Sequence, residues 1–245
     1  MTTLFGTGEK LERSELLGED TWELFEAVEA SFCVDLGDYE VLCGRSIKEL
    51  AEEINERAKF PTKEKCLSAV SFYKLRRTFG ALFNIPRSAI RPSTSLRELL
   101  PWRSRRSRWR QIEKHLGLRL PRLAYPTWAL VLSLFAPAAL LIVLKLSFGL
   151  PLNPIVIFLL SLSLAIPAIV AFSPFARVIP CEEPTLGGLA KVILAKNYSA
   201  FASGQGGSSA SDMLSALQQL VATQTGRRLD EISPEARIPQ DLNIY

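Results

Sequence analysis

The chain has 245 residues and a formal net charge of +4, and 48% of its residues are hydrophobic. Its four cysteines are scattered without metal-ligand spacing, and a single histidine excludes a histidine triad or a histidine-rich metal site within one chain. No pair of carboxylates, activated nucleophile or metal cluster stands out. We therefore expect no catalytic residue, no metal and no cofactor; an enzyme acting on membrane lipids has no residue to support it.

The first 60 residues form an acidic segment, with 15 acidic and 6 basic side chains. Residues 1–13 are expected to be a flexible lead-in without a cleavable signal peptide. Residues 14–60 predict two helices, because apolar and acidic side chains alternate at helical spacing and because Ser46 and Glu49 form a capping box for the second helix. The face of the first helix that needs cover consists of Leu17, Trp22 (or Thr21), Leu24, Phe25, Val28 and Phe32.

Residues 61–122 are basic, with 16 basic and 3 acidic side chains. Helical spacing of apolar residues predicts one helix over 66–83 and another over 102–116. The end of this segment is especially basic, with eight cationic side chains against the single acidic Glu113: Arg103, Arg105, Arg106, Arg108, Arg110, Lys114, Arg119 and Arg122.

Residues 123–177 predict a transmembrane hairpin. Two uncharged runs, 123–144 and 146–176, are separated by one lysine. The first run alone is long enough to cross a hydrocarbon core of roughly 30 Å as a helix, and turn residues early in the second run leave room for another crossing. We expect the crossings at about 126–146 and 154–175. A hairpin buried inside a soluble protein is the alternative interpretation.

Basic residues flank the two uncharged runs, because the arginine-rich stretch precedes them and Arg177 follows, whereas the turn holds only Lys145. By the positive-inside tendency, we expect a multi-pass membrane protein with two crossings and both termini in the cytoplasm. No ionisable side chain lies inside either run, so an ion or proton pathway has no support and the hairpin is expected to be an anchor.

The last part of the chain predicts half of a bundle. Residues 199–211 have the Gly/Ser composition of a linker. Residues 212–225 then predict an amphipathic helix, which carries Met213, Leu214, Leu217, Leu220 and Val221, and a loop extends to the end of the chain. One amphipathic helix cannot bury its apolar face alone, so we expect 212–245 to pair with 14–60, within a chain or between two chains.

Several stretches resemble the acyl carrier protein family, a four-helix bundle. Thr21-Trp-Glu-Leu-Phe-Glu-Ala-Val-Glu-Ala-Ser-Phe32, Val34-Asp-Leu36 and Ser46-Ile-Lys-Glu-Leu-Ala-Glu-Glu-Ile54 resemble helices II to IV, residues 85–100 and 229–245 resemble the loop after helix I, residues 102–116 resemble helix II, and residues 184–193 resemble helix IV. The resemblance implies one bundle split between 14–60 and 212–245. It implies a second bundle, made of 61–122 and 178–198, which the hairpin interrupts.

The resemblance also implies that neither bundle carries a prosthetic group. Active carriers hold phosphopantetheine on a serine at the start of helix II, and Gly18 and Trp102 occupy that position here. Ser14, one turn earlier, is the alternative attachment residue, although an N-cap is the ordinary role of a serine there. The implied fold class is all-α, with acyl-carrier-like helical bundles on the cytoplasmic side and a two-helix transmembrane hairpin.

Three kinds of partner are compatible with an arginine-rich stretch such as 103–122. Anionic lipid headgroups fit best, because a predicted membrane segment follows directly. Docking against the acidic first module is compatible with lipid contact. Nucleic acid is not expected, because no recognised nucleic-acid-binding fold accompanies the arginines.

The sequence as a whole predicts a membrane-anchored, non-catalytic interaction or scaffold protein. Its expected partners are anionic membrane lipids together with another protein or a second copy of the chain. The alternative is a functional acyl carrier, or a subunit of a membrane-associated lipid or polyketide-type acyl pathway, that uses Ser14 or a serine not recognised here.

Overall fold

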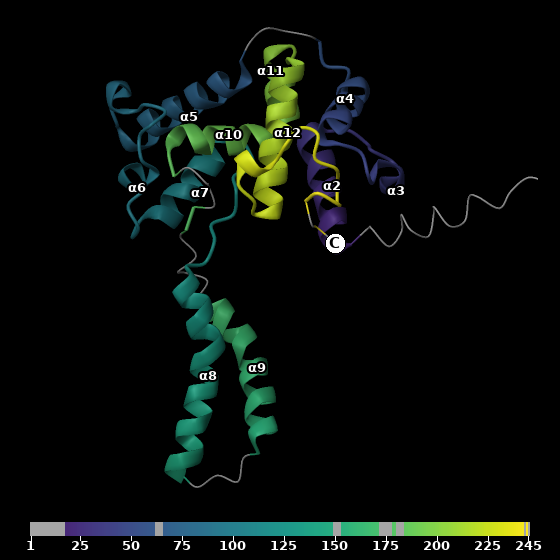
Figure 1. The fold of residues 1–245 in the computed structure, drawn as a ribbon. Coiled ribbons are helices and arrows are strands. Elements are labelled where there is room, and N and C mark those ends of the chain that lie inside the picture. The colour runs from purple at the N-terminus through teal and green to yellow at the C-terminus, as the bar shows by residue number, and fades with distance from the viewer. Residues whose placement is uncertain are drawn as a thin grey trace, which may run out of the picture. The chain divides into compact units, whose positions relative to one another are not determined.

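The computed structural model describes residues 18–61, 66–148, 153–171, 178–179, 184–242 and 244 (Figure 1). Every regular element in these ranges is an α-helix or a 3-10 helix, and the strand-like pairings within them are three isolated antiparallel bridges. The predicted all-α class is therefore confirmed for the described part of the chain. Several predictions fall outside the described residues: the lead-in 1–13, Ser14, Leu17, the hairpin turn around Gly149, Arg177, Cys181 and Tyr245.

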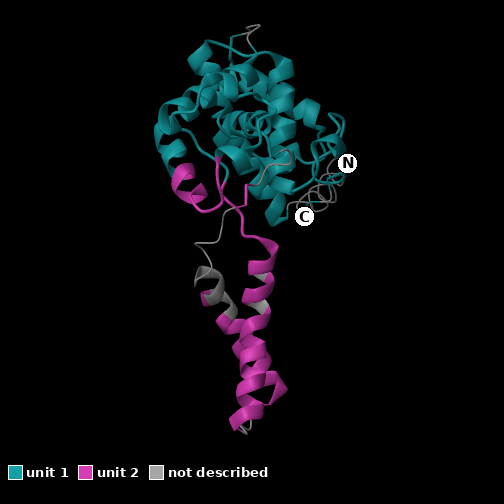
Figure 2. Cartoon of the chain, turned by 90° about the vertical axis from the view of Figure 1, so that its left-hand side faces the viewer, with its two compact units in different colours: residues 1–99, 110–121, 181–245 teal, residues 100–109, 122–180 magenta. Residues whose placement is uncertain are grey.

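The chain divides into two compact units, shown in different colours in Figure 2. Residues 1–99, 110–121 and 181–245 make up the first, which we call the core unit. Residues 100–109 and 122–180 make up the second, which we call the hairpin unit. The boundary thus differs from the predicted domains, because both helical modules contribute to the core unit and 100–109 belongs with the hairpin.

The two ends of the chain share one hydrophobic core in the core unit. Helix α12 (Ala210–Thr225) packs against α2 (Glu19–Phe32) and α4 (Ile47–Ala58), and Figure 1 shows the yellow α12 beside the purple α2. Beyond α12, the hydroxyl of Thr21 donates to the carbonyl oxygen of Ile244 at 3.1 Å. The fully buried side chains of α2, α4 and α12 include Leu24, Phe25, Val28, Leu50, Ile54, Leu217 and Val221. Residues near both ends are therefore in contact within a single chain.

The inward face of α2 differs from the prediction at one position. Thr21 is buried, whereas the side chain of Trp22 is 50% exposed. Successive helical residues are rotated by about 100°, so only one of two neighbours can share a face with Phe25 and Val28. Of the two predicted alternatives, Thr21 takes that place, where its hydroxyl has an acceptor in the last loop, and the expectation that Trp22 needs cover was wrong.

Helix α4 begins as its sequence predicts. The hydroxyl of Ser46 accepts a hydrogen bond from the backbone N–H of Glu49 at 3.2 Å, and the Glu49 carboxylate accepts one from the backbone N–H of Ser46 at 2.8 Å. Such a box satisfies two backbone donors that the first helical turn leaves without intrahelical partners. The predicted capping box is confirmed.

The second set of helices in the core unit is built on α5 (Leu67–Phe83) and α10 (Leu186–Lys196), which pack against each other. The loop after α5 contains the 3-10 helix η1 (Arg87–Ala89) and the short helix α6 (Leu96–Leu99). Helix α7 spans Arg105–Leu116, so it begins three residues later than predicted. Beyond α12, the last loop likewise contains a 3-10 helix, η3 (Leu229–Glu231).

Each of the two sets of helices contains a matching pair of backbone hydrogen bonds. They run from Ile47 N to Ala236 O (3.0 Å), Lys48 N to Pro234 O (2.8 Å), Leu186 N to Thr94 O (2.9 Å) and Gly187 N to Pro92 O (2.8 Å). Ser46 and Thr185, the N-caps of α4 and α10, also form matching antiparallel bridges. The core unit therefore contains one arrangement twice. We call residues 18–59 with 209–244 the first repeat, and 66–99, 110–121 and 184–197 the second repeat.

Helix α10 joins the two repeats. Eight of its eleven residues are buried, among them Leu189, Val192, Ile193 and Leu194. It packs against α5 of its own repeat and against α12 and α2 of the first repeat. A helix that is buried over most of its surface needs cover from several neighbours, so the repeats are fused around α10 instead of standing as separate domains.

The stretch predicted to be a Gly/Ser linker, 199–211, is largely helical. Helix α11 spans Tyr198–Gln205 and ends at Gly206, which has a positive φ of 71°. Tyr198, Phe201 and Ala202 are buried, and α11 packs against α2 and α5. The linker prediction was wrong because these few apolar side chains find cover, and the glycines serve the turn that follows.

The hairpin unit contains two antiparallel helices, α8 (Thr127–Phe148) and α9 (Pro154–Ala171), which lie side by side (Figure 1). Helix α8 is long and apolar enough to cross a bilayer, and only 12% of its apolar stretch is buried. A core helix of a soluble protein of the same composition would be mostly covered. The described apolar part of α9, Pro154–Leu164, is shorter than a crossing needs, so the second crossing stays a prediction.

The hairpin occupies, in the order of the chain, the place of a short helix of the first repeat. Helix α2 is followed by Cys33 and α7 by Gly117, both with left-handed φ, and a buried leucine comes three residues after each. In the first repeat, α3 (Tyr39–Leu42) connects that point to the N-cap of α4. In the second repeat, the chain runs through the hairpin before reaching the N-cap of α10.

Candidate functional site

The position expected to bear a carrier serine is Gly18, the N-cap of α2. Its backbone is extended, with φ −74° and ψ 168°, and it provides no side-chain cap. The Gly18 carbonyl oxygen accepts hydrogen bonds from the amides of Thr21 and Trp22, both at 3.1 Å. A glycine has no hydroxyl or other nucleophilic side chain, so no group can be attached covalently to this residue's side chain.

Trp102 occupies the corresponding position ahead of α7. Gly18 precedes Cys33 by as many residues as Trp102 precedes Gly117, and these two left-handed residues mark the ends of the matching helices. The Trp102 side chain is 40% exposed and lies against the Arg105 guanidinium, with 5.4 Å between the guanidinium carbon and the ring centroid. The two repeats therefore both have a residue other than serine at the position where a carrier serine was expected.

A small polar pocket of about 230 Å³ lies beside the start of α2. It is lined by Asp20, Glu23, Leu24, Gln224, Thr225, Arg227, Leu242 and Ile244. The lining holds two carboxylates and one guanidinium, but no serine or cysteine. The pocket can therefore form polar contacts with a partner. Its lining supplies no serine hydroxyl that could carry a prosthetic group, and it supplies no thiol.

The outer side of α2 and α3 is an acidic surface with an aromatic centre. We define the acidic surface by Glu19, Asp20, Glu23, Glu26, Asp38 and Glu40 with the exposed Trp22 and Val41. The Trp22 ring meets the Tyr39 ring edge to face, with centroids 4.7 Å apart, and its indole N–H donates to the Glu26 carboxylate at 2.9 Å. Trp22 is thus held in one orientation while half of its surface stays open to a partner.

Glu29 supports this surface from beneath. One carboxylate oxygen accepts the backbone N–H of Leu36 at 2.7 Å, and the other accepts the Tyr39 hydroxyl at 2.8 Å. Burial, followed by the hydrogen bond to Glu29 and the charges of neighbouring carboxylates, raises the pKa of Tyr39 to about 12. Tyr39 therefore stays neutral across the physiological range and keeps its place under Trp22.

The arginine-rich stretch divides into exposed and buried members. Arg103, Arg110, Lys114, Arg119 and Arg122 are exposed, and Arg106 and Arg108 are half-buried. Arg105 is only 7% exposed, and its Nε donates to the carbonyl oxygen of Leu100 at 3.0 Å. Headgroup contact is thus not open to Arg105, in contrast to the prediction, because the guanidinium serves the turn before α7.

Metal chemistry and the thiols add no site among the described residues. No group of three or more His, Cys, Asp or Glu side chains there could hold a metal ion. Cys33 and Cys66 are exposed thiols, and Cys43 is buried.

Comparisons with protein families, with curated proteins and with solved structures found no match to this chain.

Sequence reasoning missed two features of this region. It placed Trp22, with Thr21 as the alternative, on the inward face of the helix, although the run of glutamates around Trp22 indicated a solvent-facing side. It also gave no role to Asn197, whose buried side chain bonds the backbone of Arg119. Only the tertiary pairing of distant segments brings these two residues together, and no local pattern encodes it.

Proposed function

We propose that the protein is a membrane-anchored, non-catalytic interaction or scaffold protein, made of two acyl-carrier-like repeats that cannot bear a prosthetic group. The observation that carries the proposal is the pair Gly18 and Trp102, which stand at matching positions before α2 and α7. Two repeats that lack a serine at the same place are suited to hold partners rather than acyl groups.

The acidic surface on α2 and α3 supports a binding role. An exposed tryptophan that is braced by Tyr39 and Glu26 offers large contact area at low entropic cost, which is the usual character of an interface hot spot. The surrounding carboxylates favour a basic partner and speed its encounter. The partner is accordingly a basic protein surface, either another protein or a second copy of the chain.

The membrane part of the proposal rests on α8 and on charge. We infer that α8 and α9 both cross the bilayer, with both termini in the cytoplasm, because basic residues flank the hairpin on both sides. Arg103, Arg106, Arg108, Arg110, Lys114, Arg119 and Arg122 then contact anionic headgroups. Such contacts stabilise the anchored state without any catalytic group.

Incubation with coenzyme A and a phosphopantetheinyl transferase tests the proposal. We expect the intact mass of the full-length protein to stay unchanged, while an authentic acyl carrier in the same reaction gains the phosphopantetheinyl group. A gain of that mass would overturn the scaffold proposal and support the carrier alternative. A Ser14→Ala variant would then show whether Ser14 bears the group, because only attachment at that residue is lost.

A further inference from the structure

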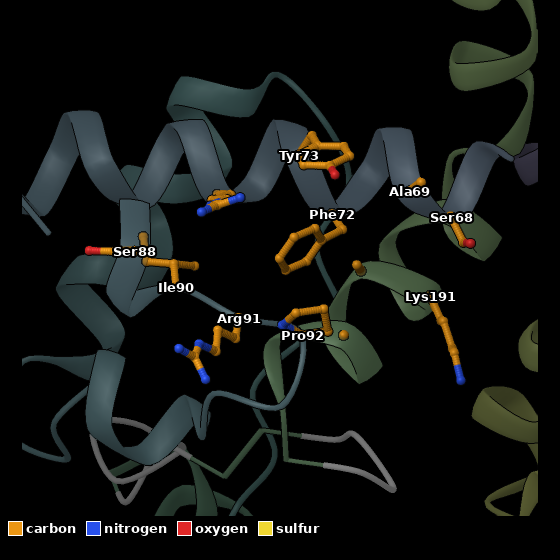
Figure 3. A pocket seen from close by; sticks show the side chains of 12 residues that line it. Ser68, Ala69, Phe72, Tyr73, Ser88, Ile90, Arg91, Pro92 and Lys191 are labelled. Carbon is orange, nitrogen blue, oxygen red and sulfur yellow. The ribbon is translucent and has the colours of Figure 1, made fainter. Parts of the chain in front are cut away.

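A second and larger pocket, of about 490 Å³, lies between α5, the loop that follows η1, and α10 (Figure 3). All its lining residues belong to the second repeat. Its volume falls in the range of pockets that hold small organic ligands. Figure 3 shows Phe72 and Pro92 at its centre, with Ile90 and Arg91 to one side and Lys191 to the other. The pocket thus has an apolar middle and a cationic rim.

The rim carries positive charge that no carboxylate in the described part of the chain neutralises by an ion pair. Arg76, Arg91 and Lys191 line the pocket, and no lining residue is acidic. None of these three cations forms an ion pair with any carboxylate in the described part of the chain. The Nε and Nη2 of Arg76 both donate to the carbonyl oxygen of Arg87, which fixes the guanidinium and leaves its remaining N–H groups for another acceptor.

The first repeat shows that this charge is not needed to build the fold. At the matching positions, Gln218 stands for Arg76, Ser233 for Arg91 and Glu52 for Lys191. Gln218 still ties its helix to the following loop, since its side-chain N–H donates to the carbonyl oxygen of Ile232 at 2.8 Å. The first repeat therefore meets this structural task without a cation, and positive charge at these positions is not a requirement of the fold.

The open volume of the pocket also depends on a residue that differs between the two repeats. Gly187 lines the pocket, whereas Lys48 stands at the matching position of the first repeat. A Cβ atom added at Gly187 would lie 3.1 Å from the carbonyl oxygen of Pro92, closer than ordinary packing allows. The glycine therefore keeps the loop against α10 and leaves no side chain over the apolar middle.

From these observations we propose that the pocket binds an amphipathic phosphate, whose head is held by Arg76, Arg91 and Lys191 and whose apolar part lies on Phe72, Ile90 and Pro92. Guanidinium groups suit phosphate because they offer several parallel N–H donors. The source is either a soluble phosphate monoester or the headgroup of an acidic phospholipid. The assignment is independent of the proposed scaffold role, because it concerns neither Gly18 nor the acidic surface.

Calorimetric titration of the full-length protein in phosphatidylcholine nanodiscs tests this assignment, with hexyl phosphate as the probe. We expect hexyl phosphate to bind at least tenfold more tightly than inorganic phosphate, and hexanol to give no signal. Arg91→Gln and Lys191→Gln should each weaken binding roughly tenfold, as expected for the loss of one charge-assisted contact. Ala69→Trp, which fills the pocket from an exposed lining position, should abolish binding.

Arg77→Gln is the matched control, because Arg77 is exposed on the same helix and does not line the pocket. Equal binding by the Arg91, Lys191 and Ala69 variants, or equal affinity for inorganic phosphate, would overturn the assignment. Phosphatidic acid added to the nanodiscs distinguishes the two sources. Competition with hexyl phosphate identifies a lipid headgroup, whereas unchanged hexyl phosphate binding identifies a soluble ester. If hexyl phosphate does not bind and phosphatidic acid gives no Arg91-dependent effect, the pocket has no such ligand.

Discussion

The side-chain amide of Asn197 pairs with the backbone of Arg119 through two hydrogen bonds, both of 2.8 Å. The Oδ1 atom accepts the Arg119 N–H, and the Nδ2 atom donates to the Arg119 carbonyl oxygen and also to that of Ile193 at 2.9 Å. Asn197 follows α10, and Arg119 lies just before the hairpin in the chain. One buried amide therefore fixes the backbone at the point where the chain leaves the second repeat.

Asn197→Ala should destabilise the core unit. The substitution removes three hydrogen bonds and leaves backbone groups of Arg119 and Ile193 without these partners, at about 1–3 kcal/mol for each buried group left unsatisfied. Thermal unfolding of the full-length protein in nanodiscs, followed by circular dichroism, should show a lower midpoint. Asn55→Ala, at an exposed position of α4, is the control and should leave the midpoint nearly unchanged. An equal midpoint in both variants would contradict this role.

Leu217→Ala tests whether the two ends of the chain depend on one core. Leu217 on α12 is fully buried, and truncating such a leucine costs about 2–5 kcal/mol. We expect limited proteolysis to cut within residues 18–59 as well as within α12, because α2 and α4 lose their cover. Ser215→Ala, exposed on the same helix, should leave the digestion pattern unchanged. A stable, uncut 18–59 in the Leu217 variant would show that this segment folds without the tail.

The elements that sequence patterns could predict are those with strong local signals. The capping box of Ser46 and Glu49 is one, since both partners lie within four residues of each other. The apolar faces of α2 and α12 are another, because their periodicity survives in any packing. The contact between the two ends follows from these faces, since each lacks cover alone.

Other features depend on tertiary contacts that no local pattern contains. Helix α11 has too few apolar residues to be recognised, and it forms because Phe201 and Ala202 pack against neighbours that are distant in sequence. Arg105 looked like one exposed arginine among many, yet it caps a turn with the Leu100 carbonyl. The larger pocket, which Gly187 lines, depends on contact between the loop around Pro92 and α10, and only the folded second repeat brings these two segments together.

Alkaline pH should destabilise the protein partly through Tyr198. Its ring contacts those of Phe32 and Phe60, with centroid distances of 4.8 and 6.1 Å, and burial raises its pKa to about 12. The unfolded chain ionises this phenol near pH 10, so the free energy of the unfolded state falls relative to that of the folded state as pH rises from 10 towards 12. Folding stability is therefore full below pH 10 and falls above it.

Tyr198→Phe isolates this contribution, because it keeps the ring contacts and removes the titrating hydroxyl. The difference in unfolding midpoint between wild type and variant should be constant below pH 10 and should shift in favour of the variant between pH 10 and 12. Subtracting the two curves removes the contributions of lysines and of Tyr39. A difference that stays constant across this window would show that Tyr198 ionises equally in both states.

The exposed arginines before the hairpin should retain anionic lipid. Replacing the exposed Arg103, Arg110 and Arg122 by glutamine removes about 1 kcal/mol of headgroup attraction per residue. We expect fewer phosphatidylglycerol molecules to co-purify with the detergent-extracted protein. The control replaces Arg77, Arg87 and Arg97, which changes the net charge equally. Equal lipid in both variants, together with tight and steeply salt-dependent DNA binding by the wild type, would favour nucleic acid instead.

Cysteine labelling tests the predicted topology, because Cys33 and Cys66 are exposed thiols of the core unit. In intact cells, a membrane-impermeant maleimide should leave both unlabelled if the core unit is cytoplasmic. A Gly149→Cys variant with the four native cysteines replaced should be labelled from outside, because the hairpin turn is predicted to lie on the opposite side of the membrane. In inside-out vesicles the pattern should reverse. Labelling of the introduced thiol from the cytoplasmic side alone would show that α8 and α9 do not cross, and the hairpin would then be an interfacial or protein-buried element rather than a transmembrane anchor.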